Sequence, residues 1–428
     1  MNNVEIFSSG KNSIDIQGMD DFIQFSRYDP YKPELFLHGI ELYENLITKY
    51  GTILYARGTK ITPKHLERLL QLRESNPNLD FPFILKKNAE LIQSFRNEIK
   101  ENLFILVNRQ TKKSQFKALL SQINVDIESF IDDILADENI TLALYHTRYT
   151  CNNSEKKKST LFFEHSLNVA IFSLAIASSF DYSKIIDKDK SKLADIFKVG
   201  LFHNYGSLST IDSILKAPDD TIFDLYWEAN RKGYSAFKHT LLNYDILNAF
   251  RLLGNYHKGQ KDFIKSTDWP AVIANIVLVA DTFITRENGL FSESQSITSV
   301  VDYLNIKVTE NEFNLLPVLT LTKGLNLRKI FDFYKELNNL IKECPYNSGV
   351  AYPLRGFKSP TLFVCKKGVN VCKHLDQSKK AVNLSYPLGE LKPGNYHMCL
   401  HLTNKLMTFY KKHYVEIKEV VAVNKKPQ

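Results

Sequence analysis

Four histidines and one aspartate in the middle of this sequence have the types and spacing that metal chemistry requires. Each lies in a separate segment, and these segments are otherwise apolar or helical in pattern. Imidazole nitrogens suit a transition metal, and a carboxylate neutralises part of its charge. The sequence therefore predicts a metal site that helices far apart along the chain assemble from His165, His203, His239, His257 and Asp281.

Two of these side chains stand in strongly apolar surroundings. His165 lies in a segment that stays apolar almost all round as far as Phe180, which is typical of a buried helix. Asp281 lies in the aliphatic run Val277–Ile284. A single histidine in such a helix is more often a core residue than a ligand, but a buried carboxylate is costly unless a cation or donors meet it. Together with His203, these two residues favour one shared site.

The segment from Thr160 to about Glu343, which must position these residues, has helical patterning nearly throughout. Upstream, residues 88–145 repeat apolar side chains at three- and four-residue steps, which predicts further helices. Residues 151–159 are polar and include three consecutive lysines, and we interpret them as a loop at a domain boundary.

The two ends of the chain have different patterns. Residues 1 to about 30 are polar, and we expect them to be irregular. Thr52–Ala56 and Phe81–Leu85 are predicted strands, and Thr62-Pro63 opens a helix between them as N-cap and first helical residue. After residue 345, glycines and prolines separate short β-branched and aromatic runs, which is typical of a small sandwich or barrel.

The predicted fold class is therefore multidomain. A small N-terminal α+β module covers residues 1–88, and a helical connector covers residues 89–150. An all-α helical bundle over residues 151–343 forms the core of the protein. A small, mostly-β C-terminal domain covers residues 344–428.

Composition limits the classes of partner. The chain has 428 residues, a formal net charge of +8 and five cysteines, an odd number that does not suggest a disulfide framework. The lysine excess is mild and spread out, so we expect no nucleic-acid polymer as partner. Met1–Glu5 lacks the basic and apolar blocks of a signal peptide, and the longest apolar run, Val272–Ala280, is too short to span a bilayer. We therefore expect a cytoplasmic protein with no membrane partner.

Short motifs surround the candidate ligands. In chain order they are His165-Ser166 with Val169-Ala170, Leu201–Ser207 (Leu-Phe-His-Asn-Tyr-Gly-Ser), His239 with Ile246-Leu247, Tyr256–Lys258 (Tyr-His-Lys) and Val279–Phe283 (Val-Ala-Asp-Thr-Phe). In this order and spacing, residues 150–343 resemble the HD-GYP family, the helical branch of the HD phosphohydrolase superfamily that hydrolyses cyclic di-GMP. The resemblance implies an HD-type all-α bundle.

The resemblance also implies two metal positions. The first would be formed by His165, His203 and Asp281, which are all present. The second would use three histidine positions, of which two remain, because the chain has Tyr256, His257 and, earlier, His239 at those places.

The family's bridging aspartate, which completes the catalytic group with His203 and Asp281, is Asn204 in this chain. A neutral amide bridges two dications poorly, because it brings no negative charge to hold them together. Without a pair of metal ions, the pKa of a bridging water is not lowered as it is at a two-metal site. Two alternatives remain for the first position: one divalent ion (iron, manganese or zinc), or a hydrogen-bonded polar cluster without metal.

Features for binding a nucleotide phosphate are reduced. The family's lysine after Ile-Gly is Ser207, and its Gly-Tyr-Pro loop is replaced by Gly259–Phe263. The remaining candidates for contacts with phosphate oxygens are Lys258, Lys261 and Arg286.

Two functions follow from the resemblance. The first is a regulator on an HD-GYP scaffold, with weak or lost phosphodiesterase activity, that binds cyclic di-GMP or a signalling protein; a homodimer is a further option. The second is a metal-dependent cyclic di-GMP phosphodiesterase with a single metal. We favour the first, since the asparagine, the missing lysine and the missing loop all point away from catalysis.

Overall fold

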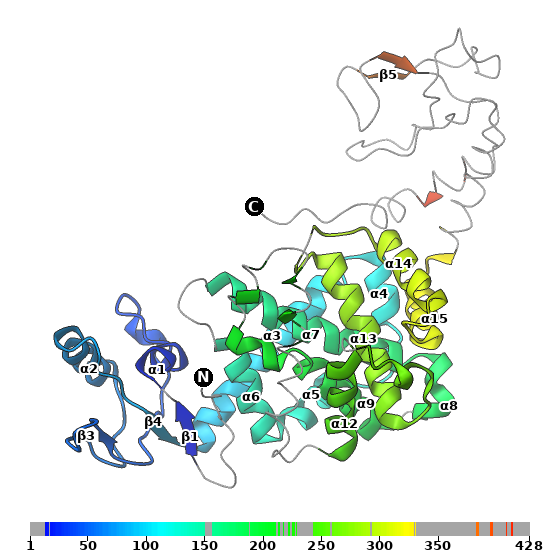
Figure 1. Cartoon of the computed structure of the whole chain (residues 1–428). Helices are drawn as coiled ribbons and strands as arrows, with labels where there is room; N and C mark the ends of the chain where they lie inside the picture. Colours follow the sequence, from blue (N-terminus) through cyan, green and yellow to red (C-terminus); the bar gives the residue numbers. More distant parts are fainter. Residues whose placement is uncertain are drawn as a thin grey trace.

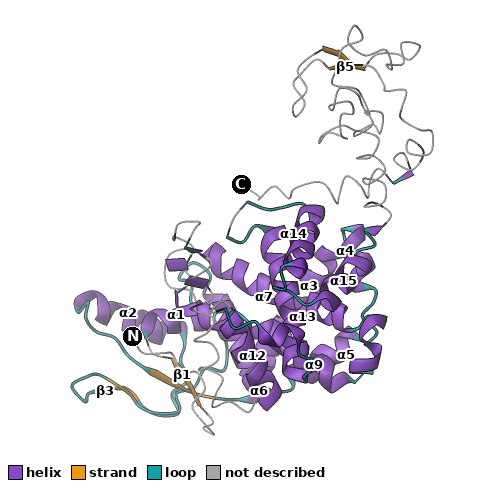
Figure 2. Cartoon of the chain, turned by 45° about the vertical axis from the view of Figure 1, so that its right-hand side comes forward, coloured by secondary structure: helices purple, strands orange, loops and turns teal. Residues whose placement is uncertain are grey.

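The computed structural model describes residues 13–16, 18–149, 156–187, 189–210, 213–214, 217, 221–222, 225–226, 228, 243–256, 259–291, 293–328, 330, 382–384, 394–396, 408 and 412–413. These residues form thirteen α-helices and three two-stranded antiparallel sheets. Most of the helices gather in one bundle, with the short strands β1 to β4 at its N-terminal side (Figures 1 and 2). The predicted helical core is confirmed.

The predicted N-terminal α+β module, residues 1–88, contains both helices and short strands. Its elements are β1 (Ser13–Ile16), α1 (Met19–Ser26), β2 (Leu46–Ile47), β3 (Ile53–Tyr55), α2 (Pro63–Ser75) and β4 (Phe83–Lys86). The prediction that residues 1–30 are irregular is wrong for residues 13–26. Strand β1 pairs with β4, and Met19 and Phe22 of α1 are completely buried. Strand β1 has only four residues, so its local sequence gives little signal for a strand. Its pairing with β4, which lies far away in the sequence, stabilises it.

The connector is helical as predicted and contributes to two hydrophobic cores. It consists of α3 (Ala89–Gln110), α4 (Ser114–Leu120), α5 (Ile127–Leu135) and α6 (Glu138–Tyr149). Leu91 and Phe95 of α3 pack into the core of the N-terminal module. Further along the same helix, Ile99, Leu103 and Leu106 pack into the core of the bundle. Helix α3 therefore fastens the module to the bundle.

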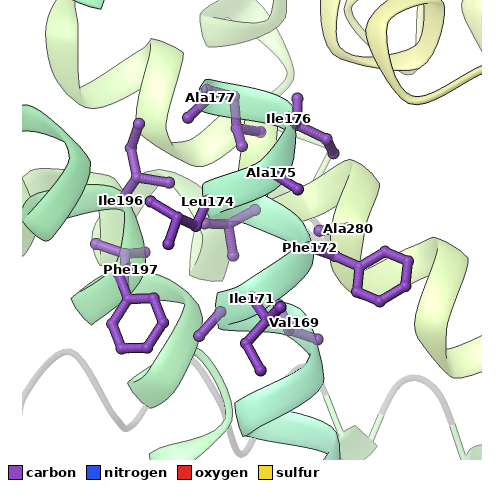
Figure 3. Packing of buried hydrophobic residues seen from close by; sticks show 14 of the residues in the cluster. Val169, Ile171, Phe172, Leu174, Ala175, Ile176, Ala177, Ile196, Phe197 and Ala280 are labelled. Carbon is purple, nitrogen blue, oxygen red and sulfur yellow. The ribbon is translucent and has the colours of Figure 1, made fainter. Parts of the chain in front are cut away.

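The bundle itself is built around two long apolar helices, α7 (Lys156–Ala177) and α13 (Trp269–Asn288). Around them lie α8 (Ser183–Ile186), α9 (Lys190–Phe202), α12 (Tyr244–Tyr256), α14 (Ile297–Thr309) and α15 (Leu315–Gly324). Figure 3 shows side chains of α7 packing against Ile196 and Phe197 of α9 and lying beside Ala280 of α13. The predicted loop at 151–159 is wrong from residue 156 onward, because α7 starts there.

Helix α13 has the length and apolar composition that crossing a membrane would require, and 78% of its most apolar stretch is buried inside the protein. Within the described residues, α7 reaches a comparable apolar length only when residues 180–186 are counted with it, and the chain bends by 68° between the two. A helix that is apolar on all sides is expected in the centre of a bundle. The position of α13 in the core accounts for its composition.

The C-terminal region is described only in short pieces. Strands β5 (Val382–Leu384) and β6 (Gly394–Tyr396) pair in antiparallel fashion. The remainder of the expected mostly-β domain at 344–428 lies largely outside the described residues, and its fold stays a prediction.

A close contact between α7 and α9 depends on Gly200. A methyl group at this position would lie 2.7 Å from the Cα atom of Ala170 in α7. Such a distance is shorter than carbon atoms tolerate, so the two backbones can approach this closely only because residue 200 has no side chain. His165 lies near the middle of α7, and His203 directly follows α9.

We predict that Gly200→Ala destabilises the protein by about 1–3 kcal/mol, because the added methyl group must push two helices apart. In a helix without this contact, the same change would stabilise by about 1 kcal/mol. Urea unfolding followed by circular dichroism measures the difference. A variant as stable as the wild type would contradict the close helix contact.

Candidate metal centre

His165, His203 and Asp281 come together inside the bundle from three different helical segments. His165 lies within α7, His203 is the residue that ends α9, and Asp281 lies within α13. The Nε2 atom of His165 is 3.2 Å from Nε2 of His203 and 2.9 Å from Oδ1 of Asp281. The third distance, from His203 Nε2 to Asp281 Oδ1, is 3.4 Å. All three residues are buried.

The end of helix α9 sets the orientation and the tautomer of His203. Its Nδ1 atom lies 2.7 Å from the carbonyl oxygen of Gly200. A carbonyl can only accept, so Nδ1 carries the proton and donates it to one of the carbonyls that a helix end leaves without a partner. The neutral ring therefore presents the lone pair of Nε2 to His165 and Asp281, which is the form that binds a metal.

His165 is held in a different way. Its Nε2 atom faces the carboxylate, but its Nδ1 atom is buried and has no hydrogen-bond partner in the described part of the chain. Packing within α7, rather than a second hydrogen bond, therefore fixes this ring. Burial lowers the pKa of His165 despite the opposing effect of its hydrogen bond to the Asp281 carboxylate, which favours the neutral imidazole.

Asp281 is kept ionised in an apolar environment. Burial alone would raise its pKa, but the electrostatic effect of the His203 and His165 rings and the hydrogen bond with His165 outweigh that effect and hold the pKa below its usual range. Thr285, one turn further along α13, donates its hydroxyl to Oδ1 of Asp281 at 3.0 Å. The site thus contains a negative charge with two imidazole rings around it.

The donor set fits a single transition-metal ion. Ligands bound at about 2.1 Å and separated by tetrahedral or octahedral angles are about 3.0–3.4 Å from one another. The three donor separations of 2.9, 3.2 and 3.4 Å lie at or close to this range. Two imidazoles and one carboxylate suit zinc, iron or manganese. The same atoms also form a hydrogen-bonded cluster when no ion is bound.

Asn204 does not supply the second negative charge that a pair of metals would require. It is completely buried, and its Oδ1 atom accepts a hydrogen bond from Ser166 Oγ at 2.7 Å. Its NH2 group has no hydrogen-bond partner within the described residues. Whichever way the amide is turned, it is neutral, and the end that carries the NH2 group cannot bind a cation. Asn204 therefore adds no charge that would help to hold a second ion.

The second predicted metal position is described only in part. His239 and His257 lie outside the described residues. Tyr256, at the third position, is buried, and its ring packs against Phe313 and Phe263. This side chain acts as part of the aromatic core.

Two of the three predicted phosphate-binding residues interact with other side chains. Lys261 forms an ion pair of 3.0 Å with Glu312. The guanidinium group of Arg286 lies 3.5 Å from the centre of the Tyr303 ring, which is a cation–π contact. Lys258 lies outside the described residues. A phosphate would have to compete with these contacts, and binding by all three residues stays a prediction.

One residue at the site was not predicted from the sequence. The hydroxyl of Tyr226 lies 3.2 Å from His203 Nε2, and the residue is only 1% exposed. A tyrosine between apolar residues is ordinary in a protein core, so its type gave no signal. Only the folded structure brings it to His203.

Comparisons of the chain with protein-family models, with curated proteins and with solved structures find no match. What the site can do therefore follows from its own donors and geometry.

We predict that Thr285→Val weakens metal binding by about 10- to 100-fold, because it removes the hydroxyl that orients the Asp281 carboxylate. Valine keeps the shape of the side chain. Titration of the protein with a metal-sensitive competing chelator measures the effect. Thr322→Val is the matched control, since the Thr322 hydroxyl donates to the Val318 carbonyl in α15; equal losses in both variants would contradict the proposed role.

Proposed function

We propose that this chain is an HD-type helical regulator that holds one divalent transition-metal ion at His165, His203 and Asp281. In this proposal it binds cyclic di-GMP or a signalling protein and has weak or lost phosphodiesterase activity. The observation that supports it is the meeting of two imidazoles and one carboxylate from α7, α9 and α13 in a buried site. The sequence motifs around these residues resemble the HD-GYP family in the same order.

Charge supports a single ion. Two dications would bring four positive charges to the site. Among the described residues, the donors of the site supply one negative charge, that of Asp281. Uncompensated charge in a buried site is strongly unfavourable. Asn204 occupies the position at which the family carries its bridging aspartate, and it adds no charge.

Burial supports a regulatory role over an efficient enzyme. The side chains of His165, His203 and Asp281 are 2–3% exposed. Hydrolysis requires that a phosphate ester and a water molecule reach the ion, whereas a structural ion is held by a closed set of ligands. An ion in this place would join α7, α9 and α13. A ligand that shifts these helices would therefore change the packing of the other helices of the bundle.

The residues at the site have two kinds of role, binding the ion and positioning the side chains that bind it. His165 and His203 would donate nitrogen lone pairs, and Asp281 would contribute the charge that holds the ion. A divalent ion supplies Lewis-acid activation of a phosphate ester when one can reach it. Gly200 and Thr285 position His203 and Asp281 through the hydrogen bonds described above.

We predict that the purified protein contains about one equivalent of iron, manganese or zinc, and that Asp281→Asn loses it, because the only charged donor of the triad is removed. Elemental analysis by mass spectrometry measures this. Asp195→Asn is the matched control. Asp195 is also a buried carboxylate in the bundle, but it accepts hydrogen bonds from Asn243 and Trp269. Protein free of metal after reconstitution would refute the proposal.

Nucleotide binding separates the regulator from the enzyme. Isothermal titration of the metal-loaded protein with cyclic di-GMP, and chromatography of the products in the presence of Mn²⁺ or Fe²⁺, test both functions together. Binding without turnover supports a nucleotide-binding regulator. Turnover that depends on the metal supports the alternative, a phosphodiesterase with a single ion. A metal-loaded protein that neither binds nor hydrolyses the nucleotide leaves a protein partner as the ligand class, for which a pull-down with and without the ion is the test.

We predict that Asn204→Asp lowers the thermal stability of the metal-free protein and raises the stabilisation gained from added metal. A second buried carboxylate is unfavourable alone, but it attracts a cation. Melting curves with and without Mn²⁺ measure both effects. Asn275→Asp is the control, because Asn275 is a buried asparagine of α13 that donates to the Phe263 carbonyl. If metal stabilises both variants equally, Asn204 does not face the ion site.

A further inference from the structure

The hydrogen bonds around the triad place the ring proton differently on its two histidines. Nδ1 of His203 lies 2.7 Å from the Gly200 carbonyl, which can only accept, so Nδ1 carries the proton and Nε2 carries a lone pair. The surroundings of His165 are reversed. Its Nδ1 atom is buried without a hydrogen-bond partner among the described residues, and its Nε2 atom faces the other two members of the triad.

Both neighbours of His165 Nε2 are acceptors. Oδ1 of Asp281, at 2.9 Å, belongs to an ionised carboxylate, and Nε2 of His203, at 3.2 Å, presents its lone pair. If His165 Nε2 also carried a lone pair, three electron-rich atoms would face one another, and the proton at Nδ1 would have no acceptor. With the proton at Nε2, His165 donates to the carboxylate, and no buried N–H group of the triad is left without an acceptor. When no ion is bound, a proton therefore lies where the three donor atoms meet.

An ion at the same point requires a different distribution of protons. A metal takes the lone pair of Nε2 from each imidazole. The ring of His203 already offers that lone pair and can bind as it stands. His165 must give up its Nε2 proton, and the neutral ring then carries a proton at Nδ1. One N–H bond breaks at Nε2 and another forms at Nδ1 through exchange with water, so the charge of the ring does not change.

We propose that His165 is a tautomeric switch that decides whether a proton or a metal ion occupies the centre. In one state, Nε2–H of His165 donates to Asp281 and completes the triad without an ion. In the other state the proton is at Nδ1, and His165 Nε2 joins His203 and Asp281 in holding the ion. His203 keeps one tautomer in both states, because the Gly200 carbonyl fixes it. This inference rests on the proposed single-ion site.

The switch links metal binding to the packing of α7, the helix that carries His165. In the metal-bound state, Nδ1–H is a buried donor without an acceptor among the described residues. Such a donor weakens binding by about 5- to 150-fold. A histidine that binds a metal ordinarily donates its second ring N–H to an acceptor. A shift of α7 that brings an acceptor to Nδ1 therefore strengthens metal binding, and by reciprocity a bound ion favours that shift.

The test is nitrogen-15 NMR of the full-length protein labelled at histidine. Spectra are recorded at about pH 8, at which exposed imidazoles are neutral because their pKa is about 6.5. Couplings between the ring nitrogens and the carbon-bound ring protons distinguish the two tautomers. Without metal, we expect the Nε2–H pattern for His165 and the Nδ1–H pattern for His203. One equivalent of Zn²⁺ should convert His165 to the Nδ1–H pattern, leave His203 in its own pattern and shift Nε2 of both rings.

His65 of α2 is the internal control. The backbone N–H of Thr62 donates to its Nδ1 atom at 3.2 Å, which fixes the Nε2–H tautomer of a ring in the N-terminal module. This ring should show the same pattern before and after Zn²⁺ is added. His165→Gln and His203→Gln each remove one signal and so assign the two rings of the triad. If either variant fails to fold, the two rings are assigned in the wild type by the response of their Nε2 atoms to Zn²⁺.

The outcomes separate failure of the switch from failure of the metal site. An Nδ1–H pattern for His165 before metal is added overturns the switch and leaves the single-ion site intact. The same conclusion follows if Zn²⁺ shifts Nε2 of both rings and the tautomer of His165 stays as it was. Wild-type protein in which no histidine ring responds to Zn²⁺ overturns the single-ion site, and the switch with it.

Discussion

The carboxylate of Asp281 is the constraint on which the arrangement of the bundle depends. It lies on α13, a long and largely apolar helix of the described bundle, where the adjacent side chains are aliphatic or aromatic. An ionised carboxylate in such surroundings must be met by donors or by a cation. His165 of α7 and Thr285 of α13 itself lie within hydrogen-bond distance of the carboxylate, and the ring of His203, at the end of α9, lies 3.4 Å from it. The polar centre therefore specifies how three helices face each other, which apolar packing alone would fix less strictly.

Two features of the backbone allow these side chains to meet. The absence of a side chain at Gly200 lets α9 approach α7 at Ala170. The carbonyl of the same glycine accepts the proton of His203 Nδ1 and so leaves Nε2 available. One residue thus controls both the distance between the helices and the protonation pattern of the imidazole. Both effects are properties of the protein chain itself.

Much of the site could be predicted from the sequence because polar residues in apolar helices are conspicuous. His165 and Asp281 violate the pattern around them, and the helical periodicity of the central region is strong. Other features depend on contacts that a linear pattern does not contain. Strand β1 is defined by its pairing with β4, and the start of α7 at Lys156 was missed because lysines suit an exposed loop and a helix equally well. Tyr226 was missed since a tyrosine among aromatic residues satisfies every expectation for a core.

The balance of charge connects a single ion with the neutral amide at residue 204. With Asp281 as the one carboxylate of the triad, a divalent ion would leave a net charge of +1 in a buried site. An aspartate at residue 204 would cancel this charge, but the chain has an asparagine whose carbonyl oxygen already accepts from Ser166. Because uncompensated charge in a buried site is unfavourable, the charge of the donors limits how many ions these three residues could hold.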